Sequence, residues 1–170
     1  MNRFAKPAIA VALAALAGPA LGQAAGLKPV GPATVAAAAA SCAASLTPTG
    51  MDEKRLAEDG WRRANLNSKD GAAVDSPLRI YARGNVVMLL TPDALKSVID
   101  DCLLMARIES EQAYGQIVAA TQASLKGRVI KEDKGSTSWM LPNRKGARIE
   151  RTGSADKPAV RVSVIHLPAQ

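Results

Sequence analysis

Aromatic residues make up only 3% of the 170-residue chain, and histidine occurs once. A single histidine cannot serve both a Ser/His/Asp triad and a His-rich metal site. The chain also lacks the glycine-rich nucleotide-binding motifs and the spacing of zinc ligands. Binding of nucleic acid would need exposed aromatics among the basic residues. We therefore expect no metal, no cofactor and no nucleic-acid partner.

Residues with catalytic chemistry are equally scarce. His166 is expected at the end of the last strand, beside valines, where a half-buried structural role is favoured. Ser154 and Lys157 match the letters Ser-x-x-Lys of penicillin-binding enzymes, but in a predicted hairpin loop and without the other two motifs. Asp100 and Asp101 form an acidic pair, of a kind that is usually solvated when it lies on a loop. No catalytic residue is assigned, and the sequence leaves enzymatic activity open.

Cysteine occurs only twice, at Cys42 and Cys102. In an exported protein an even pair of cysteines favours a disulfide. The alternative is two free buried thiols. A metal pair is disfavoured because no histidine lies nearby.

Residues 1–22 have the three-part pattern of a secretory signal peptide. Met1–Lys6 is positive, Pro7–Gly22 is uncharged and rich in alanine, and small residues surround Gly22. A membrane anchor is the alternative, but the apolar run is short and contains Pro19. We expect export by the general secretory route to the periplasm or the medium, with no membrane attachment after cleavage.

The formal net charge of +7 is distributed unevenly. Residues 23–126 carry 11 basic and 11 acidic side chains, whereas residues 127–170 carry 9 and 4. This excess favours either an acidic partner bound by the C-terminal third or a solvated basic sheet face.

The domain plan has three parts. After the signal peptide, residues 23–48 are expected to form an Ala/Pro-rich leader, disordered over Gly26–Pro32 and with a short helix over Thr34–Leu46. Residues 49–170 are expected to form a single α+β domain. Strands are expected over residues 78–83, 86–91, 102–109, 128–132, 137–141, 147–151 and 159–166. A further strand is expected over residues 61–66, with a continued helix as the alternative.

The chain also suggests an internal repeat. A helix at Asp52–Asp59 ends at Gly60, a second helix starting at Ser110 ends at Gly127, and each precedes four strands. Half-repeats 49–109 and 110–170 would each be an α-β-β-β-β unit. The expected fold is an α+β antiparallel sheet of six to eight strands with two main helices on one face. The alternative is that there is no repeat, because any helix followed by an antiparallel meander gives the same pattern of elements.

This plan is similar to the tandem repeats of the secreted β-lactamase inhibitor proteins. The resemblance is one of pattern, so it implies the layer arrangement and carries over no functional residue.

The candidate binding face pairs aromatics with nearby basic residues, as interface hot spots often do. It comprises Tyr81 with Arg79 and Arg83, and Trp139 with Arg144 and Lys145. The alternative is that both rings fill the core. We expect a non-catalytic envelope protein that binds another protein through its sheet face. The alternative is a small periplasmic enzyme whose carboxylates act on a cell-wall or sugar polymer.

Overall fold

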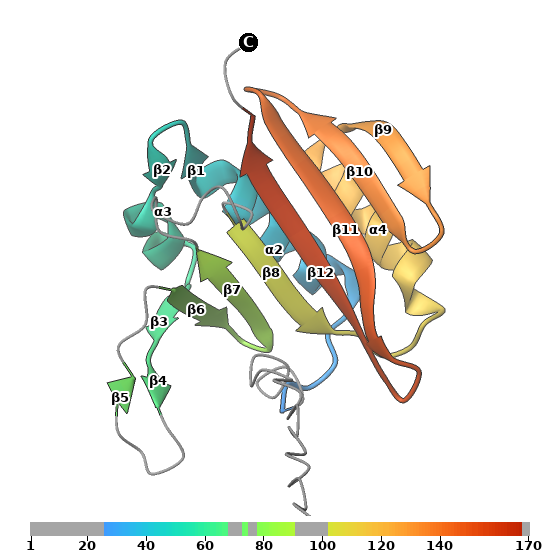
Figure 1. The fold of residues 1–170 in the computed structure, drawn as a ribbon, viewed down its shortest axis with the longest axis horizontal. Coiled ribbons are helices and arrows are strands. Elements are labelled where there is room, and N and C mark those ends of the chain that lie inside the picture. Colours follow the sequence, from blue (N-terminus) through green and yellow to red (C-terminus); the bar gives the residue numbers. More distant parts are fainter. Residues whose placement is uncertain (1–25, 68–72, 75–77, 91–101, 168–170) are drawn as a thin grey trace, which may run out of the picture.

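A computed structural model describes residues 26–67, 73–74, 78–90 and 102–167. The predicted signal peptide, the Asp100–Asp101 pair and most of the loop between residues 67 and 77 lie outside these ranges. The described chain forms an eight-stranded antiparallel sheet with two long helices on one face (Figure 1). The α+β fold class is confirmed.

The strands of the large sheet follow a mirrored order. From one edge to the other they are β3 (Arg62–Ala64), β6 (Arg79–Arg83), β7 (Val86–Leu90), β8 (Cys102–Arg107), β12 (Lys157–His166), β11 (Lys145–Ser154), β10 (Ser136–Leu141) and β9 (Arg128–Asp133). Two small pairs lie outside it, β1 (Leu46–Thr47) with β2 (Gly50–Met51) and β4 (Leu66–Asn67) with β5 (Ala73–Val74). The last strand of each half, β8 or β12, lies in the middle of the sheet.

The helices follow the predicted repeat only in part. Helix α4 (Ala113–Leu125) precedes the second set of strands, and it packs against α2 (Pro32–Ser45). The predicted helix before Gly60 exists as α3 (Glu53–Glu58), but it is a short helix. The counterpart of α4 is therefore α2, and the folded domain begins ahead of residue 49.

The run of alanines in α2 gives little amphipathic signal, so the sequence alone predicts a leader for this segment. The same alanines let it pack closely, since Ala38 and Ala39 have no exposed surface. Small side chains allow close approach of a helix to its neighbours. The expected helix over residues 34–46 is confirmed, with a role in the core.

The segment before α2 is ordered, which corrects the expected disorder over Gly26–Pro32. Val30 forms a parallel bridge with Ile108, and its N–H donates to the carbonyl of Arg107 at 2.9 Å. The Arg107 guanidinium in turn donates to the carbonyl of Leu27. These bonds attach the segment to the end of β8.

Asp52 caps the start of α3, because its carboxylate accepts the backbone N–H of Arg55 at 3.1 Å. Gly60 follows Asp59, the C-cap of α3, and its φ of +86° suits glycine better than other residues.

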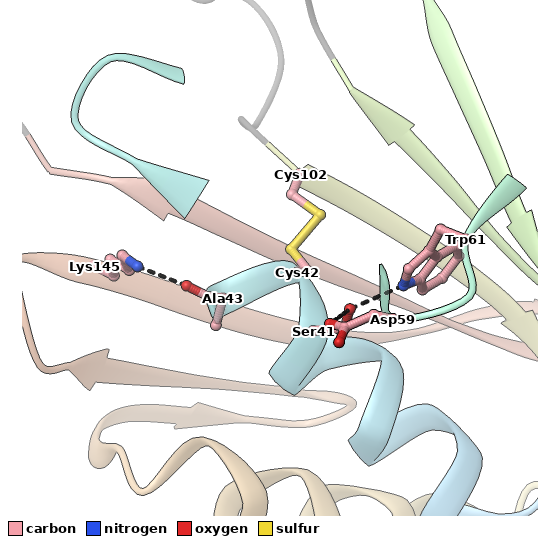
Figure 2. Close-up of a disulfide and its surroundings, with 7 residues drawn as sticks. All are labelled: Ser41, Cys42, Ala43, Asp59, Trp61, Cys102 and Lys145. Carbon is pink, nitrogen blue, oxygen red and sulfur yellow. Dashed lines mark hydrogen bonds between the residues drawn. A yellow bond between two sulfur atoms is a disulfide. The ribbon is translucent and has the colours of Figure 1, made fainter. Parts of the chain in front are cut away.

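The predicted disulfide is present and joins α2 to β8. Cys42 and Cys102 are bonded with their Cα atoms 6.3 Å apart (Figure 2). Beside it, the indole N–H of Trp61 donates to the Ser41 hydroxyl at 2.9 Å, and that hydroxyl donates to Asp59. One covalent bond thus joins α2 to β8, and a short chain of hydrogen bonds joins α2 to the segment between α3 and β3.

Within the described ranges, no helix is long and apolar enough to cross a membrane.

Candidate binding surface on the open sheet face

The two faces of the sheet can be assigned from the strand register. Cys102 and Leu104 pair with Val164 and Val162, and all four are buried beneath the helices. Residues between them point to the other side, which we call the open face. There Leu103 pairs with Ser163.

The open face has an unusually apolar half for a sheet side that none of the described long helices covers. Its side chains on β7, β8 and β12 include Leu89, Leu103, Met105 and Ile165, all half-buried. Antiparallel sheets usually carry polar residues on the side facing water. Apolar surface of this kind is typical of an interaction site.

A hollow of about 350 Å³ lies at the other half of the open face. Its rim includes Ile130 of β9 and Met140 of β10, which are 50% and 36% exposed. Gly146 of β11 forms part of its floor, where an added Cβ would lie 3.4 Å from Ile165. The hollow therefore exists partly because Gly146 has no side chain, and exposed apolar side chains form its rim.

A cluster of three charges lies at one end of this hollow. The Glu150 carboxylate accepts from Arg148 Nη2 at 2.7 Å and from Arg161 Nε at 2.9 Å. Glu150 is largely buried, whereas about half of each arginine side chain is exposed. One carboxylate neutralises only one guanidinium, so the cluster remains positive.

Basic side chains predominate across the open face as a whole. The register places on it Arg62, Arg107, Arg128, Lys131, Arg148 and Arg161, against Asp133 and Glu150. A surface with this balance attracts acidic groups.

The two aromatic residues predicted to bind a partner lie on the opposite side. Trp139 has no exposed surface and Tyr81 only 4%, and both belong to the core under the helices. This corrects the assignment of these rings to a binding face, because a ring without exposed surface offers nothing to a partner. The alternative, that both rings fill the core, describes their position.

Tyr81 and Arg79 instead form a cluster with Glu53 of α3. The Tyr81 hydroxyl and the Arg79 guanidinium both donate to the Glu53 carboxylate. The hydrogen bond from Tyr81 and the charge of Arg79 hold the pKa of Glu53 below its usual value. Burial first, and then the bond to Glu53, raises the pKa of Tyr81 to about 12.

The other basic residues of that prediction lie apart from one another. Arg83 stacks over the ring of Trp61, 4.9 Å from its centre. Lys145 reaches the carbonyl of Ala43 at 2.6 Å, and Arg144 lies in the turn between β10 and β11. The six predicted residues therefore form no continuous surface.

Sequence reasoning missed the Arg148–Glu150–Arg161 cluster, although a signal existed. Arg148 and Glu150 alternate with apolar residues along β11, so they share one face of that strand. Arg161 lies opposite Glu150 only because β11 and β12 pair in one particular register. That register brings Glu150 and Arg161 together, although they lie on different strands.

Two guanidinium groups, one carboxylate and two serine hydroxyls are among the polar groups that line the hollow on the open face. Within the described ranges, no three His, Cys, Asp or Glu side chains gather to hold a metal ion. Asp100 and Asp101, on which the carboxylate-enzyme alternative depends, lie outside those ranges. No known protein family, curated protein or solved structure matches this chain.

Proposed function

We propose that this is an exported, non-catalytic protein that binds an acidic protein partner through the open face of its sheet. The observation that carries the proposal is the hollow bounded by Ile130 and Met140 and ending at Arg148 and Arg161. Methionine and arginine are enriched at protein interfaces, where apolar contacts exclude water and guanidinium groups bind carboxylates.

The partner would insert an apolar side chain above Gly146 and place a carboxylate against the exposed guanidinium groups. The apolar residues on β7 and β8 would extend the contact beyond the hollow, since a stable interface is larger than one pocket. The signal-peptide pattern and the disulfide support a periplasmic or secreted location.

Site-specific photocrosslinking in the cell envelope tests the proposal. A photoreactive residue at Met140 should crosslink to a defined acidic protein, whereas one at Gln116, exposed on the helical side, should not. Crosslinks of the same pattern from both positions would contradict binding through the open face.

A binding measurement with the captured protein provides the second arm. Met140→Asp should weaken binding about tenfold or more, because it places a charge at an apolar contact facing acidic groups. Gln116→Asp is the matched control, because it adds the same charge on the helical side. Intact-mass analysis of the exported protein checks cleavage, with an expected start between about Gln23 and Gly26.

A further inference from the structure

A second hollow lies on the helical side of the molecule. It has a volume of about 500 Å³ and forms where the last turns of α2 and α4 meet the turn between β10 and β11. Helix α3 also contributes one lining residue, so four segments of the chain build this hollow. It shares no lining residue with the hollow on the open face.

The charged residues that line this second hollow are all basic. Arg55 comes from α3, Lys126 from the end of α4 and Lys145 from the start of β11. No Asp or Glu is among the described residues that line it. The rest of the lining is mostly apolar, with Leu125 and Leu141 among its larger side chains. We call this site the basic hollow.

The positive charges of the basic hollow are not balanced locally. The Lys145 ammonium donates to the carbonyl of Ala43, which is neutral (Figure 2). Burial, and then the nearby charge of Arg55, lowers the pKa of Lys145. Arg55 and Lys145 line the same hollow, and neither forms a salt bridge with a described residue. An anion bound there would reduce the repulsion between their charges.

The backbone around the basic hollow is also unusual. Only three described residues other than glycine have positive φ, and they are Lys126, Asn143 and Arg144. Lys126 and Asn143 line the hollow, and Arg144 follows in the same turn. A left-handed conformation is disfavoured for a residue with a Cβ, and a helix end of this type usually has glycine.

Lys126 combines an uncommon backbone conformation with a positive charge. It lies at the C-cap of α4 with φ 53° and ψ 33°, where glycine would fit with less strain. Its charge is favourable at a helix C-terminus and also belongs to the lining of the hollow.

We infer that the basic hollow binds a phosphate group carried on an apolar body. Three cations favour an anion with more than one negative charge, such as a phosphate monoester. The volume is far larger than a phosphate needs, and the apolar lining suits a hydrocarbon or ring attached to it. A phosphorylated small molecule and a phospholipid head group share this chemistry.

NMR titration of the purified protein, with its disulfide intact, tests the site. The ligands are inorganic phosphate and glycerol 3-phosphate, and the amide signals of residues 124–126 and 143–145 should shift. The double variant Arg55→Gln/Lys126→Gln should weaken binding about tenfold or more. Two results together would overturn the inference. These amide signals would not shift, and the double variant would bind the lipid vesicles described below as well as the wild type does.

Vesicle co-sedimentation distinguishes the two sources of phosphate. Vesicles of phosphatidylglycerol in phosphatidylcholine should bind the protein if the source is a lipid, and pure phosphatidylcholine should not. If the soluble phosphates alone bind at the hollow, the source is a small molecule.

Two further variants separate the site from general electrostatic attraction and from misfolding. Lys134→Gln removes one charge at the turn between β9 and β10, at the other end of β10, and should leave binding unchanged. An equal loss with Lys134→Gln and with Lys126→Gln would overturn the inference. Lys126→Gly should weaken binding while keeping or raising the melting temperature, which excludes unfolding as the cause.

Discussion

Single polar residues in this protein attach the short helix α3 to the rest of the fold. The Ser41 hydroxyl accepts from the buried indole of Trp61 and donates to Asp59. Glu53 receives hydrogen bonds from Tyr81 and Arg79 on β6. If one partner of such a bond is removed, the other polar group stays buried without a hydrogen-bond partner, which lowers the stability of the folded state.

Ser41→Ala should lower the free energy of unfolding by about 1–3 kcal/mol, because the Trp61 N–H loses its acceptor in a buried place. Urea denaturation measures the change. Ser154→Ala is the matched control, because that hydroxyl bonds to Asp156 on an exposed turn and its loss should change little. Equal effects of the two changes would contradict the role given to Ser41.

The Glu53 cluster should make part of the stability dependent on pH. Because the folded-state pKa of Glu53 is lowered, its contribution is present above the unfolded pKa and is lost as pH falls through the folded value. Glu53→Gln should cost about 0.5–1 kcal/mol at pH 7, a small value because the carboxylate is more than one third exposed.

Urea denaturation of both proteins from pH 7 to pH 3 checks this expectation. The difference between wild type and Glu53→Gln should shrink toward the acid end. A difference that stays constant over the range would contradict it.

Strand β10 shows how one element separates core from surface. Trp139 points under the helices and has no exposed surface, whereas its neighbour Met140 lies on the open face and is 36% exposed. Alternation along a strand places adjacent residues on opposite sides of the sheet.

Trp139→Ala should lower stability by about 3–5 kcal/mol, because it removes a large buried side chain and leaves a cavity. Met140→Ala should cost much less and act on partner binding instead. Chemical denaturation of both variants distinguishes the positions. A stable Trp139→Ala protein would show that the ring is not part of the core.

The end of α4 depends on a glycine that contacts β10. An added Cβ at Gly127 would lie 2.5 Å from Leu141 Cδ2 and 2.9 Å from Trp139 Cβ. Gly127→Ala should therefore destabilise the protein by about 1–3 kcal/mol through overpacking.

Gly115→Ala offers a control inside the same helix. Nothing lies within 4 Å of its added Cβ, and alanine favours the helix by about 0.5–1 kcal/mol. In thermal denaturation, Gly127→Ala should lower the melting temperature and Gly115→Ala should raise it.

At the scale of the whole molecule, the disulfide joins α2 to β8 in the middle of the sheet. Cys42 and Cys102 are 60 residues apart in sequence. Such a cross-link restricts the unfolded chain more than the folded one.

Cys102→Ser should lower stability by about 2–4 kcal/mol, measured by denaturation under non-reducing conditions. Thiol titration of the denatured, unreduced wild-type protein should find no free thiol. Two free thiols per chain would show that the bridge does not form in the exported protein.

Local patterns were sufficient to predict much of this fold. Examples are the neighbouring strands expected over residues 78–83 and 86–91, the alternation along β11 and β12, and the helix stop at Gly127. Each depends on neighbours in the chain. The pair Cys42–Cys102 followed from the number of cysteines and the expected compartment. These features were predictable because the physical cause of each lies within a few residues or in composition.

Only the tertiary structure decided which side of the sheet lies under the helices and which side is the open face. In β8 both Cys102 with Leu104 and Leu103 with Met105 are apolar, so alternation alone could not tell which set lies under the helices. The weakly amphipathic α2 gave little sign that it is the helix packed against α4. The Arg148–Glu150–Arg161 cluster and the basic hollow both depend on contacts between elements far apart in the chain. Such contacts are set by register and packing, and these are properties of the assembled sheet rather than of any one segment.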